Sequence, residues 1–395
     1  MRIAIDALIV SRQGAGVAGF ARNMIRALLL CDRENEYHLF GKRDCLEPIC
    51  LAKGERFPNA HIHHTAPIVS ASPPLRILWE QIVLPKRLRA IDADVCWYPD
   101  HTLSLLDEDH SSVITIYDLS FLRMPGTHPF LRRLYKSGTI RRSVRLASKI
   151  ICVSEFTRRE VSQLLGVPEE HLHVSGAGLE QRFSSESHPE ALNALRARYS
   201  LPERFILFVG TIEPRKNLVR TIEAYASLKK EEGIPHVLAI AGKRGWLSGE
   251  IFRRAREVEK RAPVRFLGYV PDDDLPLLYN ASELLVYPSL YEGFGLPVLE
   301  AMACGTPVVT SNSSSLPEVV GEAGVLVNPY DVGAIKEGIR RALLDSNLRE
   351  RLRREGLKRA QTFTWEKAAK ETLKVLTLAA RERLQAAKNQ RSTYA

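Results

Sequence analysis

The sequence predicts an α/β protein made of two Rossmann-like, doubly wound domains that face a cleft. Short apolar runs alternate with helix-length amphipathic stretches in both halves of the chain, and this alternation is typical of βαβ units with parallel sheets. The chain has 395 residues, more than one ordinary hydrophobic core accommodates. A polar, proline-containing stretch at 181–204 separates two series of apolar runs, so we expect an N-terminal domain at 1–185 and a C-terminal domain at 186–369.

The first series of apolar runs starts at the N-terminus, with strands predicted at 2–7, 94–99, 112–118 and 149–154 and a helix at about 18–30. The second series starts with FILFVG at 205–210 and continues through HVLAIAG, VRFLG, ELLVYPS, PVVTS and GVLVN. From about residue 365 the chain is helix-compatible, and we expect its last helix, about 370–395, to pack back on the first domain. Such sheets bind ligands at the carboxyl ends of their strands, so functional motifs should lie in strand-to-helix loops.

Composition and charge narrow the classes of protein and partner. Apolar residues make up 45% and charged residues 26%, the balance of a soluble globular protein. No run approaches the roughly 18 apolar residues that span a bilayer, and the N-terminus lacks a basic leader, so we expect a cytoplasmic protein. The formal charge of +10 favours an anionic partner, which is a nucleic acid, a phosphorylated small molecule or an acidic membrane surface.

The six cysteines show no CxxC spacing and read as reduced, mostly buried thiols. Cys45 and Cys50 could ligate a metal, but two cysteines at that spacing are more often incidental. We therefore expect no metal site.

The motif LYEGFGLPVLEAMACG, at 290–305, carries two glutamates. Pro297 suits the first turn of a helix and Gly305 the position just past its end, so the preceding loop leads into a helix N-terminus, which is a natural phosphate site. Glu292 in the loop and Glu300 in the first helical turn would flank that site, one acid for each sugar beside a diphosphate. In the alternative interpretation, Glu300 only complements the helix dipole and Glu292 is a solvated loop residue.

A second motif, FVGTIEPRKNLVRTIEAY, places two adjacent cations in a strand-to-helix loop. A strand is expected to end at Gly210 and a helix to begin near Asn217, with Arg215 and Lys216 between them. Two cations there would neutralise a diphosphate as it leaves. A solvated basic loop is the alternative.

A third motif, RQGAGVAGFARNM, has Gly14, Gly16 and Gly19 at GxGxxG spacing ahead of a helix. Acidic residues about 20 positions further on, Glu34 and Glu36, leave a dinucleotide site open. We prefer a glycine loop whose amides meet a phosphate or sugar across the cleft.

The chain resembles the retaining glycosyltransferases of family 4, which have the GT-B fold. The resemblance is carried by EGFGLPVLEAMACGTPVVTS and also by VGTIEPRKNL, VSEFTRRE, SLPEVVGEAGVLVNP and ITIYDLSFLRMPGTHP. It extends from about residue 1 to residue 375 and is stronger in the C-terminal domain.

The resemblance implies a role for each matching residue. Glu300 would bind the nucleotide ribose, and Lys216 would pair with phosphate. The base would be contacted by Tyr269 and Val270, and Gly16 would approach the donor from the other domain. The transferred sugar and diphosphate would be held by Glu292, Gly293, Phe294, Gly295 and Leu296.

Two positions depart from the family pattern. Thr211 stands where arginine is common, so Arg215 would supply that phosphate contact. Tyr117 precedes Asp118 where the family often has His-Asp, and a tyrosine hydroxyl can hydrogen-bond to the donor sugar but cannot carry an imidazole's charge.

The resemblance implies transfer of a hexose from a nucleotide diphosphate sugar to a glycan or lipid-linked acceptor, with retention of configuration and without metal or cofactor. GDP-mannose is the favoured donor and cell-surface polysaccharide the favoured product. An epimerase or phosphorylase on the same fold is one rival. A basic nucleic-acid-binding protein is another, although the chain has no zinc-finger or aromatic RNA-binding signature and we expect no nucleic acid partner.

Two further segments suggest surfaces. Residues 130–149 hold seven Lys/Arg and no acid among apolar residues, which predicts a basic amphipathic helix. It would rest peripherally on an anionic membrane, such as the inner face of the cell membrane, or present an ordinary solvated face. Residues 72–90, with Trp79 central, would line an acceptor groove or, more simply, pack in the core.

Overall fold

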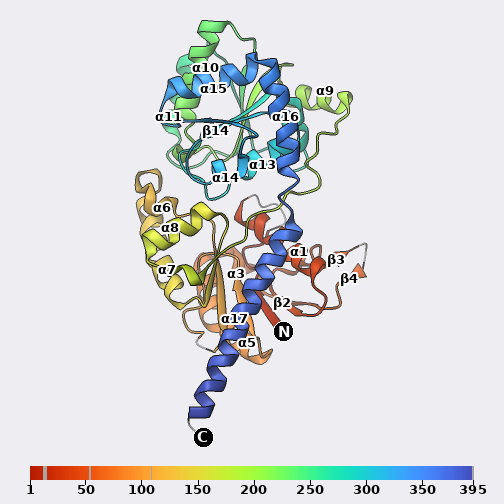
Figure 1. Ribbon diagram of the computed structural model, residues 1–395, viewed down its shortest axis with the longest axis vertical. Coiled ribbons are helices and arrows are strands. Elements are labelled where there is room, and N and C mark those ends of the chain that lie inside the picture. The colour runs from red at the N-terminus through yellow and green to blue at the C-terminus, as the bar shows by residue number, and fades with distance from the viewer. Residues whose placement is uncertain (12–15, 53–54, 108, 394–395) are drawn as a thin grey trace. The chain divides into compact units, whose positions relative to one another are not determined.

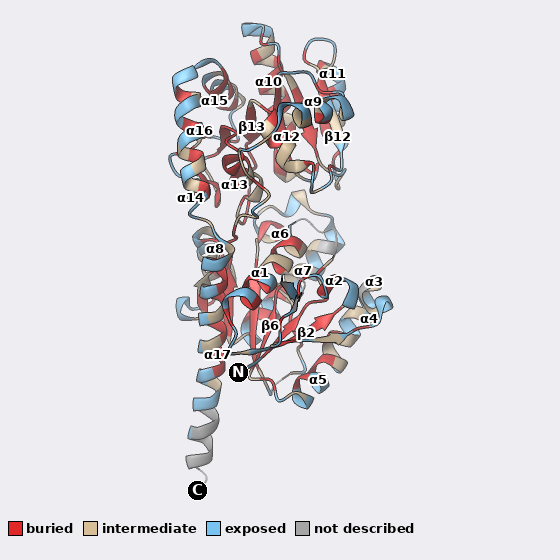
Figure 2. Ribbon diagram, turned by 90° about the vertical axis from the view of Figure 1, so that its right-hand side faces the viewer, coloured by how far each residue is buried: buried red, intermediate tan, exposed pale blue. Residues whose placement is uncertain are grey.

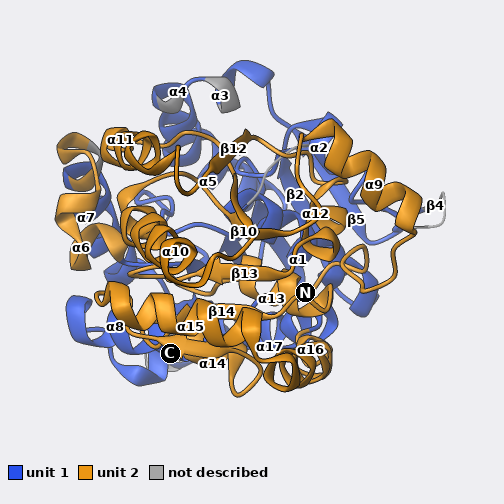
Figure 3. Cartoon of the chain, turned by 90° about the horizontal axis from the view of Figure 1, so that it is seen from above, with its two compact units in different colours: residues 1–119, 134–178, 364–395 blue, residues 120–133, 179–363 orange. Residues whose placement is uncertain are grey.

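The computed structural model describes residues 1–11, 16–52, 55–107 and 109–393, which form two compact units (Figure 3). Unit 1 comprises residues 1–119, 134–178 and 364–395, and unit 2 comprises residues 120–133 and 179–363. The expected boundary between 185 and 186 therefore differs from the one in the structure, where the chain passes into unit 2 after Gly178. The short segment at 120–133, which interrupts unit 1, was not anticipated.

Unit 1 is built on a parallel sheet whose seven described strands have the order β5-β2-β1-β6-β7-β8-β9. These strands are β1 (Arg2–Asp6), β2 (Glu36–Gly41), β5 (Ala60–His64), β6 (Val95–Tyr98), β7 (Ser111–Ile116), β8 (Lys149–Cys152) and β9 (Leu172–Val174). The central strands are buried on both faces, as a sheet between two layers of helices requires (Figure 2). A small antiparallel pair, β3 (Leu51–Ala52) and β4 (Glu55–Arg56), lies apart from this sheet.

The helices of unit 1 include two that are distant in sequence but packed together, α1 and α17 (Figure 1). The helical segments of unit 1 are α1 (Val17–Cys31), α2 (Arg43–Leu46), α3 (Pro67–Ala71), α4 (Pro73–Leu78), the π-helix η1 (Trp79–Val83), α5 (Leu84–Ala90), α7 (Phe130–Leu146) from Leu134 onward, α8 (Glu155–Leu165), η3 (Glu169–His171) and α17 (Trp365–Thr393). Helix α17 also packs on β6, β7 and β8, so the C-terminal helix belongs to unit 1.

The predicted basic helix differs from α7 in two respects. Helix α7 ends at Leu146, and Lys149 begins β8, where its ammonium is buried and pairs with Glu382 at 2.9 Å. The apolar side chains are also not gathered on one buried face, because Leu131 and Leu134 are exposed while Val144 is buried.

The segment at 72–90 is only partly a core segment. Leu84 and Leu88 are fully buried, as the simpler interpretation required. Ile77, Leu78 and Ile82 are exposed, so one side of this segment remains an apolar surface.

Unit 2 is built on a second parallel sheet, with six described strands in the order β12-β11-β10-β13-β14-β15. The strands are β10 (Phe205–Val209), β11 (Val237–Ala241), β12 (Val264–Gly268), β13 (Leu284–Tyr287), β14 (Val308–Ser311) and β15 (Val325–Val327). The helical segments are α6 (Ser120–Arg123), η2 (Pro125–Thr127), α9 (Pro189–Arg198), η4 (Pro214–Lys216), α10 (Leu218–Glu232), α11 (Gly249–Val258), α12 (Leu275–Ala281), α13 (Leu296–Ala303), α14 (Leu316–Val320), α15 (Val332–Leu344) and α16 (Ser346–Ala360). A continuous hydrophobic core joins this sheet to its helices.

The stretch at 181–204 is not simply a connection. Helix α9 lies within it and packs against α12, and Leu195 is buried in the core of unit 2. In the part of the chain that the structure describes, no helix is long and apolar enough to cross a membrane.

Candidate active site in unit 2

The candidate site lies at the carboxyl ends of β10 and β13, which are neighbours in the sheet. The order of strands reverses between them, because β11 and β12 continue on one side and β14 and β15 on the other. Loops diverge at such a point, which is where doubly wound sheets bind their ligands. The loop after β10 carries Arg215 and Lys216, and the loop after β13 carries Glu292.

The loop after β10 has a compact local structure. Residues 214–216 form a 3-10 turn, and Asn217 adopts a left-handed conformation with φ of 60° immediately before α10. Its side-chain amide donates to the carbonyl of Pro288 at 3.0 Å and to that of Pro329 at 2.6 Å. Asn217 therefore ties the two site loops together.

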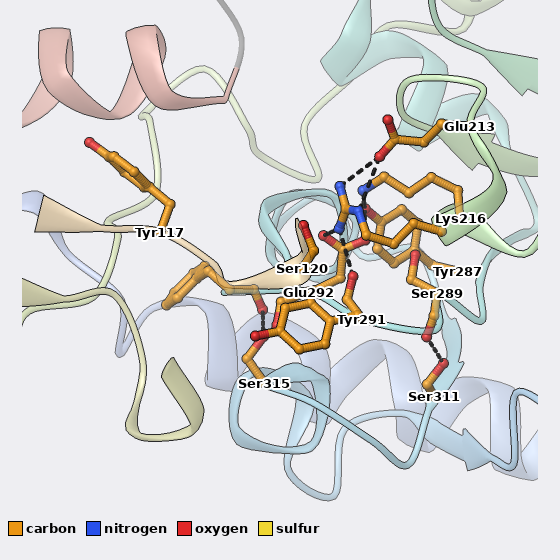
Figure 4. Close-up of polar contacts among 12 residues, drawn as sticks. Tyr117, Ser120, Glu213, Lys216, Tyr287, Ser289, Tyr291, Glu292, Ser311 and Ser315 are labelled. Atoms are coloured by element: carbon orange, nitrogen blue, oxygen red, sulfur yellow. Dashed lines mark hydrogen bonds and ion pairs between the residues drawn. The ribbon is translucent and has the colours of Figure 1, made fainter. Parts of the chain in front are cut away.

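Four charged side chains form one cluster in these loops, in which Glu213, Lys216 and Glu292 are buried and the Arg215 side chain is 13% exposed (Figure 4). The Glu292 carboxylate accepts from Lys216 Nζ at 2.6 Å and from Arg215 Nη1 at 2.9 Å. Arg215 Nη2 also donates to Glu213 at 2.8 Å, and Lys216 Nζ donates to the Tyr287 hydroxyl at 2.6 Å. The two cations and two anions balance, so the cluster is neutral overall.

Electrostatics in this cluster keep Glu292 ionised. Burial by itself raises the pKa of a carboxyl group, but Arg215 and Lys216 outweigh it and hold the pKa of Glu292 at about 2. Burial and the neighbouring Arg215 lower the pKa of Lys216, while Glu292 acts in the opposite direction. Removal of Glu292 would thus leave two buried cations poorly compensated.

Glu300 lies further along α13 than its predicted position. The helix begins at Leu296, so Glu300 is in its second turn rather than its first and does not simply complement the helix terminus. Its carboxylate accepts from the Tyr279 hydroxyl at 2.8 Å. Burial raises the pKa of Glu300 to about 7, although Tyr279 and Arg182 lower it. Glu300 and Glu292 therefore have contrasting environments.

The glycine-containing loop between β13 and α13 ends at Gly295, whose φ of 112° suits a residue without a side chain. Gly293 and Gly295 are buried, and Phe294 packs edge-to-face on Phe363 with 5.9 Å between ring centroids. The loop that carries Glu292 therefore leads directly into α13, which begins at Leu296.

The two residues predicted to contact the base have different surroundings. Tyr269 is 42% exposed, and Lys243 Nζ lies 4.4 Å from the centre of its ring. The side chain of Val270 is buried in the core of unit 2, so only its backbone is suited to a ligand contact.

Three predicted site residues belong to unit 1. Gly16 has φ of 65° and precedes α1, where a Cβ atom would meet no other atom within 4 Å. The Tyr117 hydroxyl donates to the carbonyl of Pro99 at 3.1 Å, and Asp118, like Tyr117, is half-buried. Gly14 lies outside the described residues.

Several polar residues around the site were missed by the sequence analysis. Glu213 and Tyr287 complete the charge cluster, Tyr279 binds Glu300, and the Ser315 hydroxyl contacts the carbonyls of Glu292 and Phe294. Tyr287 ends a predicted strand beside the glutamate loop, which was a usable signal. Tyr279 and Ser315 are brought to the site from α12 and from the start of α14. Ser315 begins the motif SLPEVVGEAGVLVNP, but the motif does not show which residues it contacts.

Within the described residues, no group of three or more His, Cys, Asp or Glu side chains is arranged to hold a metal ion. None of the six cysteines is in a disulfide, and all but Cys31 are buried. Their burial agrees with the expectation of mostly buried thiols.

Two family models match the chain. The model Glycosyltransferase Family 4 matches residues 15–180, and Glycosyl transferases group 1 matches residues 195–359. The chain is 33% identical over 365 residues to O-antigen chain mannosyltransferase B of Escherichia coli, and this alignment covers 92% of this chain and 96% of that protein. It is also 37% identical over 227 residues to the serotype-specific mannosyltransferase WbdA of Escherichia coli, which covers 56% of this chain and 28% of that protein.

Solved structures support the fold. The structure of Anabaena HepE in complex with UDP and glucose matches with a TM-score of 0.71 at 19% identity, covering 95% of this chain and 99% of that one. WaaG, described as a glycosyltransferase involved in lipopolysaccharide biosynthesis, matches with a TM-score of 0.70 at 18% identity and covers 95% of this chain and 100% of that one. The predicted pair of Rossmann-like domains is confirmed, and the chain belongs to the GT-B glycosyltransferases of family 4, with mannosyltransferases among its relatives.

Proposed function

We propose that this glycosyltransferase transfers mannose from GDP-mannose to a glycan acceptor on a growing surface polysaccharide, with retention of configuration and without a metal ion. The observation that carries the proposal is the buried cluster of Glu292, Arg215 and Lys216 where the strand order reverses in unit 2. The similarity to an O-antigen chain mannosyltransferase over most of the chain supports mannose and a polysaccharide product.

The proposed reaction is a direct exchange at the anomeric carbon. The acceptor hydroxyl oxygen forms a bond to that carbon while the bond to the diphosphate oxygen breaks on the same face. The hydroxyl proton passes to an oxygen of the leaving diphosphate. Arg215 and Lys216 would stabilise the negative charge that develops there, and Glu292 would hold both cations and accept a hydroxyl of the transferred sugar.

The remaining residues would bind the nucleotide sugar. Glu300, held by Tyr279, would accept the ribose hydroxyls, and Tyr269 with the backbone of Val270 would meet the base. For Gly16, Tyr117 and Asp118, which belong to unit 1, a contact with the donor stays a prediction from the sequence. No protein nucleophile takes part in this scheme.

The first test is a thermal-shift comparison of GDP-mannose with UDP-, ADP- and dTDP-sugars. A ligand that binds only the folded protein raises its apparent stability. We expect a shift with GDP-mannose that is lost in Glu300→Ala and kept in Glu231→Ala, an exposed glutamate of the same unit. A folded protein that no nucleotide sugar stabilises would overturn the proposal.

The stereochemical and metal claims need a product assay. Mannose transferred to membrane lipid extract, with excess EDTA present, should be recovered with the α configuration that it has in the donor. NMR of the anomeric carbon–hydrogen coupling distinguishes this from the β product. A β-linked product, or activity abolished by EDTA and restored by Mg²⁺, would contradict retention or metal independence.

The exposed side chains of helix α7 support a second part of the proposal, in which the protein contacts an anionic membrane peripherally and meets a lipid-linked acceptor there. The helix contains no acidic residue. Its first two turns expose large apolar side chains: Phe130 at 64%, Leu131 at 78%, Leu134 at 61% and Tyr135 at 51%. Exposed basic residues follow at Arg141, Arg142 and Arg145. Apolar insertion next to positive charge is the pattern of a helix that lies on an acidic lipid surface.

Vesicle flotation tests this contact. The protein should float with phosphatidylglycerol vesicles and not with phosphatidylcholine vesicles, and salt should weaken the binding. Leu131→Gln with Leu134→Gln should abolish flotation, whereas Leu384→Gln, an exposed leucine on α17, should not. Equal flotation of both variants would place the contact elsewhere.

A further inference from the structure

Ser315 lies at the start of α14, beside the loop that joins β13 to α13. Its side chain is fully buried, and its hydroxyl is 2.9 Å from the carbonyl oxygen of Glu292 and 2.8 Å from that of Phe294 (Figure 4). A serine hydroxyl has one proton to donate, so the two carbonyls share it. One side chain therefore holds two peptide groups of the site loop.

Those two peptide groups determine where two amide donors point. Each carbonyl belongs to a planar peptide group with the N–H of the next residue, and no described peptide bond is cis. In a trans peptide the C=O and N–H bonds point in opposite directions. Because Ser315 draws the carbonyls of Glu292 and Phe294 toward itself, the N–H groups of Gly293 and Gly295 are directed away from it.

The earlier part of the loop is held by other side chains. Asn217 binds the carbonyl of Pro288, Ser311 Oγ donates to that of Ser289 at 2.5 Å, and Arg215 donates to that of Tyr291 at 2.6 Å. Loss of the Ser315 hydroxyl would thus loosen only the segment from Glu292 to Gly295.

The backbone at Gly295 also lies close to the residue after Ser315. A Cβ atom on Gly295 would be 2.8 Å from the Leu316 side chain, closer than carbon atoms normally approach. The Ser315 hydroxyl and the Leu316 side chain thus both contact the glycine loop and restrict its position.

We propose that Ser315 is a positioning residue for the nucleotide diphosphate sugar, a role that rests on the proposed function. By holding the carbonyls of Glu292 and Phe294, it aims the N–H groups of Gly293 and Gly295 at the distal phosphate and the transferred sugar. Ser315 itself touches neither group and acts through the loop.

The test is calorimetric titration of Ser315→Ala with GDP and with GMP, alongside GDP-mannose kinetics. GMP lacks the distal phosphate, so its affinity should stay at the wild-type value. The affinity for GDP should fall about tenfold, and kcat should fall with GDP-mannose, since one lost amide donor to a developing anion typically costs that much or more. Ser315→Cys, which keeps the side-chain volume with a weaker donor, should behave like Ser315→Ala or lie between it and the wild type.

Ser111→Ala is the matched control for a simple loss of stability. Ser111 is buried in unit 1, and its hydroxyl donates to the carbonyl of Ala379 at 2.8 Å. This control should lower Tm while both nucleotide affinities are unchanged. Wild-type affinity for GDP in both Ser315 variants, or an equal loss for GMP and GDP, would overturn the positioning role. If the wild type binds none of GDP, UDP, ADP and dTDP, the proposed function fails instead.

Discussion

Glu292 is the residue on which the charges of the candidate site converge. Its carboxylate contacts both adjacent cations and the Tyr287 hydroxyl, and its own main-chain carbonyl is held by Ser315. The sequence placed an acid in a glycine loop and two cations in another, but it did not show that they pair. An unpaired charge is costly to bury, so the pairing is as much a condition of folding as of function.

Substitution of this glutamate should therefore affect stability as well as activity. Glu292→Gln keeps the shape of the side chain but leaves Arg215 and Lys216 with Glu213 alone. Breaking a buried ion pair by removing one partner costs about 3 to 5 kcal/mol, so the free energy of unfolding in urea should fall by that order. Glu231→Gln, at an exposed pair with Lys336, should leave the urea midpoint unchanged. An unaltered midpoint for Glu292→Gln would mean that the cluster is solvated.

Glu300 should make nucleotide binding depend on pH near neutrality. Its folded pKa of about 7 is above the usual value of 4.5, so the folded protein holds this proton more tightly than the unfolded chain. The contribution of Glu300 to stability is then complete below about pH 4.5 and is lost as pH rises through 7. Ribose hydroxyls donate to the ionised form, so affinity for GDP should rise between pH 6 and pH 8.

Calorimetry at several pH values checks this expectation, with Glu300→Gln as the comparison. The variant cannot ionise, so its affinity should be lower and flat over the same range. Its stability should also fall less than that of the wild type as pH rises from 5 to 8. A wild-type affinity that does not change over this range would show that Glu300 is already ionised at pH 6.

At the scale of elements, helices whose apolar residues repeat at helical spacing were predictable from the sequence, and helices without that regular spacing were not. Helix α1 was expected at about 18–30 and spans Val17–Cys31, because its apolar positions repeat at helical spacing. Helix α9 was read as a connection because its serine- and proline-containing surroundings are polar. In α7, exposed apolar side chains occupy the first two turns and exposed basic side chains follow them, so the helix does not have the single apolar face that the sequence pattern suggests.

Helix α17 shows how an element from the end of the chain supports unit 1. Leu376 is fully buried on it, whereas Leu378 is 37% exposed. Leu376→Ala should lower the free energy of unfolding by about 2 to 5 kcal/mol, because a cavity forms beneath the helix. Leu378→Ala should cost much less, and chemical denaturation of both variants checks the difference. Equal losses would mean that the helix does not pack as described.

At the scale of the whole molecule, the sequence predicted two Rossmann-like folds because each series of apolar runs is complete. It did not predict the path of the chain between them, since the crossings at 119–120, 133–134, 178–179 and 363–364 depend on long-range contacts. The same holds for the site, where the loops were predicted from their motifs and the pairings were not.

The two units should respond differently to nucleotide. All the described residues of the charge cluster, together with Glu300 and Tyr279, belong to unit 2. GDP at 100 times its Kd should stabilise the state that binds it by about 2.7 kcal/mol. In hydrogen exchange, peptides covering 205–217 and 287–300 should gain protection more than peptides covering the α17 helix. Protection confined to unit 1 would mean that the nucleotide site has been placed in the wrong half of the chain.

Helix α17 follows unit 2 in the sequence but packs in unit 1, and this order has a consequence for synthesis on the ribosome. Ser111 binds the carbonyl of Ala379, 268 residues later, and Lys149 pairs with Glu382. Most of the sheet of unit 1 emerges early, but the helix that covers β6, β7 and β8 is translated only after residues 179–363 of unit 2. Unit 2 can therefore fold while the sheet of unit 1 still lacks the helix that covers β6, β7 and β8. A chain that terminates before α17 would keep that apolar sheet exposed, and chaperones and proteases would then recognise the chain as incompletely folded.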